Sequence, residues 1–370
     1  MMASARAVHD RTGRGRRGPF SALAMEQAAR HTTVDVGVFA HNEAANIRNV
    51  LFSLMAQRIV PPKLRRVLVF SSSYDGTNEV VDDLARNDGR IALVRERTRD
   101  GKAASVNRFL KSSGADICVV LSADVVPDIG AVDALVEALD DPEVGLAGAT
   151  VVPTNSAETF FGYVSHLLWG LHGRFGKVGE MIAFRRCLVP EIADTTSVDE
   201  AFVQVVVSRK GKRATCVPDA IVWNRGPGNI SDFMRQRSRI FAGHMKLAAE
   251  LSARVPTMDY GFFKDAVRLA VQESDQVRRR SGIPAWKAAA WLVLAGFLEA
   301  MARIEGALTL VTSGEQTVWK QVPSGRSPFR TGGSGLSGGA QTGTRGPANY
   351  AMARPSPIIG VTAADAMLSG

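Results

Sequence analysis

The stretch VDVGVFAHNE, residues 34–43, decides the fold of this chain, because an apolar β-branched run ends directly in polar residues. The run over 34–39 is typical of a buried strand. Asn42 suits a helix N-cap, and apolar residues then recur at helical spacing over 47–55. We therefore predict a strand followed by a helix, with Asn42 and Glu43 at the carboxyl end of the strand.

The same alternation continues downstream. Strands alternating with helices favour right-handed crossovers and a mainly parallel sheet, and such sheets bind ligands beyond the carboxyl ends of their strands. We expect an α/β fold with a Rossmann-like sheet flanked by helices and a site at those strand ends. The predicted strands are 67–70, 91–95, 117–121, 145–152, 181–184, 214–217 and 221–223; the predicted helices are 80–84, 103–112, 199–209 and 230–250, with a loop-and-helix insertion over 156–178.

Composition and charge exclude several classes of protein. The 370 residues are 45% hydrophobic and 22% charged, which excludes a disordered or collagen-like chain. Three cysteines lie far apart without metal-ligand spacing, which disfavours a zinc site and favours a reducing compartment. Most of the net charge of +9 lies at the ends, and residues 32–322 carry only +2. A nearly neutral body argues against a nucleic-acid partner.

The two ends and the last apolar segment differ from the central part. We predict a disordered basic arm over 1–31, a flexible Gly-, Ser- and Pro-rich tail over 323–370, and a helical segment over 251–322. Within that segment, the uncharged run 288–298 is shorter than the roughly 20 residues of a membrane span. A buried core helix and an interfacial helix anchored by Trp286 and Trp291 remain as alternatives.

Polar residues follow each predicted strand of the first half. The loop at Asp75 presents hydroxyls and backbone N–H groups to a polar ligand. Gly101 allows close backbone approach, and Lys102 adds a positive charge at a helix start, which together suit a diphosphate. Asp124 after the fourth strand can hold Mg²⁺ or Mn²⁺. Together these loops predict a site for an anionic, metal-bound ligand.

In their order these motifs resemble family 2 glycosyltransferases, which have the GT-A fold. The resemblance spans about residues 33–245. It is carried by VDVGVFAHNEAANI (34–47), SSSYDGTNEVV (71–81), RDGKAASVN (99–107), LSADVVP (121–127), GEMIAFRR (179–186), SVDEAFVQVVVSRKGKR (197–213), VPDAIVWNRGP (217–227) and QRSRIFAGH (236–244).

The resemblance implies roles for individual residues. Asp199 and Glu200 match the acidic pair that supplies the catalytic base, and Asp124 matches the last residue of the DxD metal motif. A nucleotide-diphospho-sugar donor would lie against Ala40, Asn42, Glu43, Asp75, Lys102, Asn107, Ser122 and Ala123, while Gln236, Arg237 and Arg239 would face the acceptor and the leaving diphosphate.

The chain departs from the family pattern at several positions. Ser122 replaces the first Asp of the metal motif, which weakens the predicted Mg²⁺ or Mn²⁺ site, and Ser71 replaces an Asp that reads the nucleotide base. The acidic pair runs Asp199-Glu200 in reversed order, so the sequence leaves open which of them is the base. Ile240 stands where the family has Trp.

The resulting prediction is an inverting glycosyltransferase with a glycan or lipid-linked acceptor, acting in cell-envelope polysaccharide, glycolipid or lipid-linked glycan synthesis at the cytoplasmic face of the plasma membrane. A non-catalytic nucleotide-sugar-binding protein and a sugar nucleotidyltransferase are the alternatives. His244 is a further candidate metal ligand, although a lone histidine on a helix more often has a structural role. Trp169 and His172 in the insertion are candidates for stacking against the acceptor.

Overall fold

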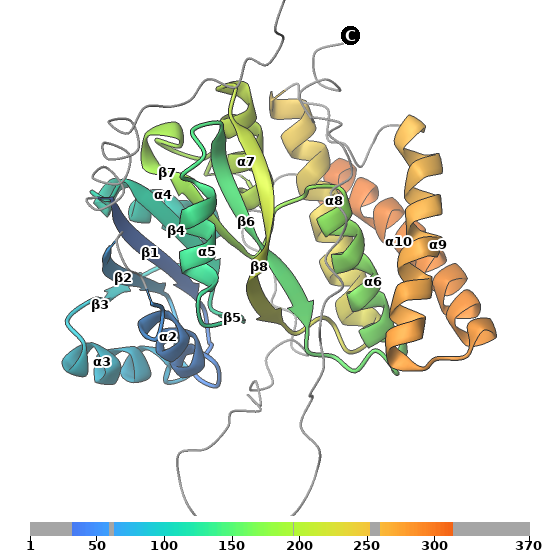
Figure 1. Cartoon of the computed structure of the whole chain (residues 1–370), viewed down its shortest axis with the longest axis horizontal. Coiled ribbons are helices and arrows are strands. Elements are labelled where there is room, and N and C mark those ends of the chain that lie inside the picture. The colour runs from blue at the N-terminus through green and yellow to red at the C-terminus, as the bar shows by residue number, and fades with distance from the viewer. Residues whose placement is uncertain (1–31, 59–62, 195, 252–259, 314–370) are drawn as a thin grey trace, which may run out of the picture.

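The computed structural model describes residues 32–58, 63–194, 196–251 and 260–313 (Figure 1). Its centre is an eight-stranded sheet of order β3-β2-β1-β4-β7-β6-β8-β5. The strands are β1 (Thr33–Ala40), β2 (Lys63–Ser71), β3 (Ile91–Arg95), β4 (Ile117–Ser122), β5 (Val125–Pro127), β6 (Val144–Pro153), β7 (Met181–Arg185) and β8 (Arg213–Asn224). The predicted basic arm over 1–31 and the predicted tail over 323–370 lie outside the described residues.

Helices connect and cover the strands. They are α2 (Ile47–Met55), α3 (Thr77–Asn87), α4 (Lys102–Ser112), α5 (Ala131–Ala138), α6 (Phe160–Arg174), α7 (Asp199–Arg209), α8 (Ile230–Leu251), α9 (Tyr260–Ser281) and α10 (Ala285–Ser313), with a short 3₁₀ turn at Arg186–Leu188. The α/β architecture predicted from the strand–helix alternation is thereby confirmed. The segment after 251 is helical in its described part.

Two strands, β7 and β5, run opposite to the other six strands of the sheet. β1 pairs in parallel with β2 and β4, and β2 pairs in parallel with β3, as the crossover argument predicts. β7 then runs antiparallel between β4 and β6. In the register, Ala40 lies opposite Ser71, and Phe39 lies opposite Ser122. The loops that carry the polar motifs therefore begin at one edge of the sheet.

The sheet is covered on both faces because its strands are apolar on both sides. On one face, Val34, Val36 and Val38 of β1 pack in a cluster with α2, α3 and α5. On the other face, Phe39 and Phe70 pack with α4 and α7, where Phe109 is fully buried. A parallel strand buried on both faces has no polar alternation, which explains the near-continuous apolar runs in the sequence.

A separate helical layer follows the sheet. The helices α6, α8, α9 and α10 gather beside the long strands β6 and β8 (Figure 1). Their core includes the fully buried Tyr163, whose hydroxyl donates a 2.7 Å hydrogen bond to the Ser274 hydroxyl of α9. The predicted insertion over 156–178 is therefore helix α6, and it packs against the C-terminal helices.

Helix α10 is longer than the uncharged run in the sequence indicated. It has 29 residues, and its stretch Ala285–Thr312 is long and apolar enough by composition to cross a membrane. The prediction that this segment is too short to span a membrane was therefore wrong. It was based on the uncharged run 288–298 alone, whereas the helix continues on both sides of that run. One face, with Ala288, Leu298 and Ala302, is buried against neighbouring helices, whereas Phe297 is 61% exposed on the other.

Candidate active site

The loops after β1 and β2 hold each other in place. Asn42 has a left-handed backbone with φ of 56°, and its side-chain oxygen accepts a 3.0 Å hydrogen bond from the N–H of Tyr74. Asp75 accepts from the N–H of Ala44 at 3.1 Å and from Thr77. These bonds lower the pKa of Asp75 although partial burial opposes the shift. The two predicted donor-binding loops thus form one rigid polar rim, with Glu43 at the same edge.

Lys102 lies between the two carboxylates that the sequence singled out. Gly101, with φ of 99°, ends the preceding loop in a conformation that L side chains rarely adopt, and Lys102 is the first residue of α4. Its ammonium lies 2.9 Å from Asp199 Oδ2 and 2.7 Å from Glu200 Oε1. The structure therefore joins the predicted diphosphate corner to the predicted base, two segments that lie 98 residues apart in sequence.

The contact with Lys102 gives the two carboxyl groups of the acidic pair different pKa values. Burial, followed by the charge of Glu200, raises the pKa of Asp199 to about 6. Burial also opposes ionisation of Glu200, but the attraction of Lys102 is stronger and lowers the pKa of Glu200 to about 2. Two adjacent carboxylates cannot ionise equally, so Glu200 carries the negative charge first.

A second pair of carboxyl groups lies close to Glu200. Desolvation by the surrounding protein raises the pKa of Asp124, against the attraction of Lys102 and Arg239. Burial, then the charges of Asp124 and Glu200, raise the pKa of Glu180 to about 8. The site thus brings the predicted metal ligand Asp124 together with Lys102, Arg239 and the acidic pair.

Several predicted residues have mainly positioning contacts. The amide of Asn107 donates to the Ile192 carbonyl at 2.8 Å and to Asp194 at 2.7 Å, and its oxygen accepts from the N–H of Ile192. Asn107 therefore fixes the segment before α7, and its contact with the donor stays a prediction. The carbonyl of the buried Ala123 accepts a 2.7 Å hydrogen bond from Asn46. Ala40 and Ser122 end β1 and β4 at the site edge, and Gln236 is partly buried on α8.

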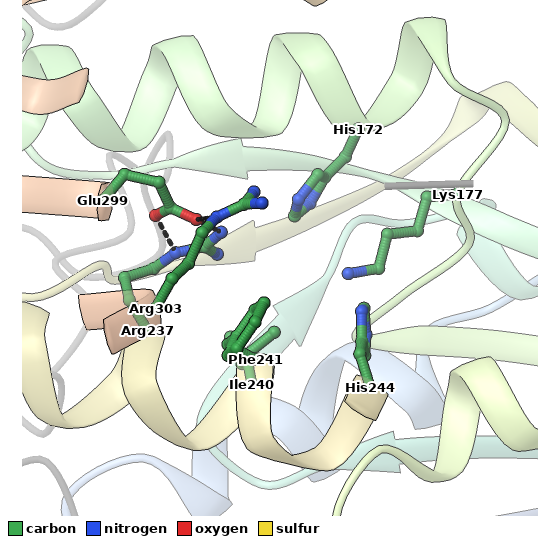
Figure 2. A pocket seen from close by; sticks show the side chains of 8 residues that line it. All are labelled: His172, Lys177, Arg237, Ile240, Phe241, His244, Glu299 and Arg303. Atoms are coloured by element: carbon green, nitrogen blue, oxygen red, sulfur yellow. Dashed lines mark hydrogen bonds and ion pairs between the residues drawn. The ribbon is translucent and has the colours of Figure 1, made fainter. Parts of the chain in front are cut away.

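Arg237 and Arg239 are separated by the helix geometry of α8. The guanidinium of Arg237 forms a two-point pair with Glu299 of α10, at 2.7 and 2.9 Å, whereas Arg239 interacts with the charges of Asp124 and Glu180. Arg239 is thus the arginine that faces the predicted metal ligand Asp124. Arg237 and His244 line a pocket whose walls are His172, Lys177, Arg237, Ile240, Phe241, His244, Glu299 and Arg303 (Figure 2).

Four charged residues of this region were missed by sequence reasoning. Glu180 lies within the quoted motif GEMIAFRR, and its left-handed backbone, with φ of 59°, gives no signal in a sequence. Lys177 lies in a Gly- and aromatic-rich stretch, and Glu299 and Arg303 interrupt an apolar helix. A charged residue inside an otherwise apolar helix was the available signal, because such residues are costly to bury unless they are paired.

Comparisons with known proteins agree with the predicted family and fold. The model of glycosyl transferase family 2 matches residues 35–188. A probable glycosyltransferase, YdaM, of Bacillus subtilis (strain 168) is 24% identical over 60% of this chain and 57% of its own length. An N-acetylglucosaminyltransferase of Rhizobium meliloti (strain 1021) is 23% identical over 60% of this chain and 58% of its own length. The chain thus spans less than two thirds of both relatives.

A solved structure of another protein is similar to this chain over most of the length of both. A mannosyltransferase from Pyrobaculum calidifontis, in complex with GDP-Man and Mn²⁺, superposes with a TM-score of 0.56 at 21% identity. The match covers 80% of this chain and 95% of that chain. The likeness shows the GT-A fold for this chain, including its helical C-terminal part.

Proposed function

Residues 35–188 belong to glycosyl transferase family 2, and from that premise we propose that the whole chain is an inverting glycosyltransferase. It moves a sugar from a nucleotide-diphospho-sugar donor to a hydroxyl acceptor in the synthesis of cell-envelope polysaccharide, glycolipid or lipid-linked glycan. The observation that carries the proposal is the contact of Lys102 with Asp199 and Glu200. It joins a cation suited to a diphosphate with a carboxylate suited to deprotonating an acceptor.

Glu200 is the proposed catalytic base. Its charge interacts with Lys102 and Asp124 on the side of the strand ends, and also with Lys177 and His244 of the pocket. A base must first lie within reach of the acceptor, and Glu200 is the member of the pair that meets both regions. Asp199, which is 7% exposed, holds Lys102 against Glu200.

Charge compensation during transfer is assigned to the chain's own cations. Lys102 and Arg239 offset the negative charge that grows on the leaving diphosphate. When the donor binds and Lys102 turns part of its attraction to the diphosphate, the pKa of Glu200 rises from about 2 toward its usual value, which makes Glu200 a stronger base.

The residues at Asp124 fit Mg²⁺ or Mn²⁺ only together with the donor. No three His, Cys, Asp or Glu side chains form a metal-binding group within the described ranges. The raised pKa values of Asp124 and Glu180 indicate two carboxyl groups short of positive charge, and a hard cation accepts such oxygens along with phosphates and water. Bound there, the metal would supply Lewis-acid stabilisation of the diphosphate. Ser122 brings no charge, and His244 is assigned to the pocket.

The exposed side of α10 supports the part of the proposal that places this enzyme at a membrane surface, for which we propose the cytoplasmic face of the plasma membrane. Trp286 and Val293 are each 74% exposed, and Val311 is 85% exposed. Apolar residues on one face of a helix favour an interface with lipid. We expect Val293→Glu to reduce co-sedimentation with phosphatidylglycerol vesicles, with Glu305→Gln on the same helix as control. Equal sedimentation of both variants and wild type would remove the membrane from the proposal.

The test of the catalytic proposal uses two readouts on the same protein. Thermal shifts with UDP-GlcNAc, GDP-Man and other nucleotide sugars, each with and without Mn²⁺, report donor binding. Product formation with sugar acceptors reports transfer. We expect Glu200→Gln to retain the thermal shift and lose transfer, while Glu191→Gln, an exposed control, behaves as wild type. Transfer at the wild-type rate in Glu200→Gln would exclude Glu200 as base, and binding without transfer by the wild type would favour a non-catalytic binding protein.

A further inference from the structure

The pocket between α6, α8 and α10 carries an excess of positive charge. Lys177, Arg237 and Arg303 line it, and Glu299 is the one carboxylate among its lining residues. Glu299 accepts from Arg237 and, at 3.1 Å, from Arg303. Burial opposes the charge of Glu299, but the attraction of Arg237 lowers its pKa to about 2, so the carboxylate is ionised. Two positive charges are left over.

Lys177 is the cation of this pocket that has no direct ion-pair partner among the described residues, and Glu200, Glu180 and Glu299 attract it only from a longer range. Within the described part of the chain, its ammonium has no direct ion pair or hydrogen bond, and burial, then the charge of Arg237, lower its pKa to about 8. In Figure 2 the Lys177 ammonium points toward the space beside His172 and His244. Partly buried charges are normally paired, so this ammonium is arranged for a partner that the chain itself does not supply.

The two histidines contribute hydrogen-bonding groups rather than charge. Burial, then Lys177, hold the pKa of His172 well below its usual value, and burial lowers that of His244 to about 3. Both rings are therefore neutral at pH 7 and each can donate one N–H. Nδ1 of His172 is buried and has no hydrogen-bond partner among the described residues. The ring is held edge-to-face against Trp169, with centroids 4.9 Å apart.

The pocket lies on the acceptor side of the proposed base. All of its lining residues come from positions 172–303, and the strand-end loops of the first half contribute none. Glu200 contacts Lys102 directly and interacts by charge with Lys177 and His244. A group bound in the pocket would therefore be near the base without occupying the place of the donor.

We propose that this pocket binds a phosphate group of the acceptor, so that the acceptor is a phosphorylated sugar, polyol or lipid. The surplus of two positive charges matches the charge of a phosphate monoester, which is about −1.5 to −2 at pH 7, better than it matches a single carboxylate. Guanidinium and ammonium groups together with imidazole N–H donors suit phosphate oxygens. The inference rests on the proposed glycosyl transfer and names the acceptor class of that site.

The experiment measures binding of phosphate compounds to the full chain by calorimetry at pH 7 and constant ionic strength. Mn²⁺ and the nucleoside diphosphate that stabilises the chain most are present, so that the donor side is filled. Inorganic phosphate and glycerol 3-phosphate are the soluble probes. Phosphatidylcholine vesicles with and without phosphatidate test whether the phosphate belongs to a lipid. Tighter binding to phosphatidate vesicles than to glycerol 3-phosphate supports a lipid source, and the reverse supports a soluble acceptor.

Two variants and one control decide the assignment. Lys177→Gln and Arg303→Gln should each weaken phosphate binding at least about tenfold, because each removes a charged hydrogen-bond donor. Lys111→Gln, an exposed lysine on α4, should bind as wild type. Wild-type affinity in both pocket variants, or no phosphate binding by the wild type, overturns the proposal. If phosphate binding fails in this way but a nucleotide still raises the melting temperature, only the acceptor assignment is wrong. If phosphate binds but no nucleotide does, the glycosyltransferase proposal is wrong, and the acceptor assignment is wrong with it.

Discussion

The ion pair between α8 and α10 gives a stability prediction with a defined dependence on pH. Glu299 accepts two hydrogen bonds from Arg237 and one from Arg303, and its side chain is 21% exposed. Its pKa falls from the usual 4.5 to about 2. At about 1.4 kcal/mol for each pH unit, this corresponds to roughly 3 kcal/mol of folding free energy at pH 7. Glu299→Gln should therefore lower the free energy of unfolding by about that amount.

The sign of the pH dependence follows from the lowered pKa. The stabilisation is fully present above pH 4.5, where the unfolded carboxyl is ionised, and it is lost as the pH falls toward about 2. The difference between Glu299→Gln and wild type should shrink from about 3 kcal/mol at pH 7 to roughly 1.4 kcal/mol at pH 3. Urea unfolding followed by circular dichroism at both pH values measures it.

Two further variants test the reasoning. Glu305→Gln lies on the exposed part of the same helix and should change stability by no more than about 0.5 kcal/mol. The double variant Arg237→Met/Glu299→Met should recover part of the loss, because neither charge then remains buried alone. A loss in Glu299→Gln that is the same at pH 3 and pH 7, or as small as that of Glu305→Gln, would refute the assigned ion pair.

Two other predictions concern the site and the core. Lys102→Gln removes the cation that holds the pKa of Glu200 at about 2, so the pKa of Glu200 should rise. As the pH is lowered, the variant should then lose its remaining transfer activity at a higher pH than wild type does, because the base becomes protonated earlier. Superimposable pH–rate profiles would contradict this. Gly37→Ala places a methyl group 2.8 Å from the ring of the fully buried Phe109 and should destabilise the fold by about 1–3 kcal/mol. Gly89→Ala, which meets nothing within 4 Å, is its control, and equal melting temperatures for the two variants would show that the ring yields without cost.

The sequence predicted the sheet because its signals are local. Apolar runs such as 34–39 and 117–121 need only their own composition to indicate buried parallel strands, and each crossover has one favoured hand. The polar residues at the strand ends were found for the same reason, since the edge of a parallel sheet brings successive loops together. Asn42, Asp75, Lys102 and Asp124 could therefore be singled out before any contact was known.

The roles of individual residues within the predicted groups depend on the tertiary structure. Sequence order could not distinguish Asp199 from Glu200, because their difference arises from burial and from Lys102, which comes from another helix. Arg237 and Arg239 are two positions apart on α8, so they point to different sides of the helix, and only the packing of α10 shows which one meets Glu299.

The sequence by itself predicted most strands and helices of the sheet domain, although not β5 and α5, and it predicted the edge of the sheet and the residue types that we propose for a diphosphate. The tertiary structure alone decided which charges are paired. It places Glu180 near Asp124, and it places Lys177 near Arg237 of α8 and Arg303 of α10. These residues are far apart in sequence, so no local sequence pattern predicts that they meet. The physical reason is that pKa values and surplus charge depend on desolvation and on neighbours in space, which exist only once the chain is folded.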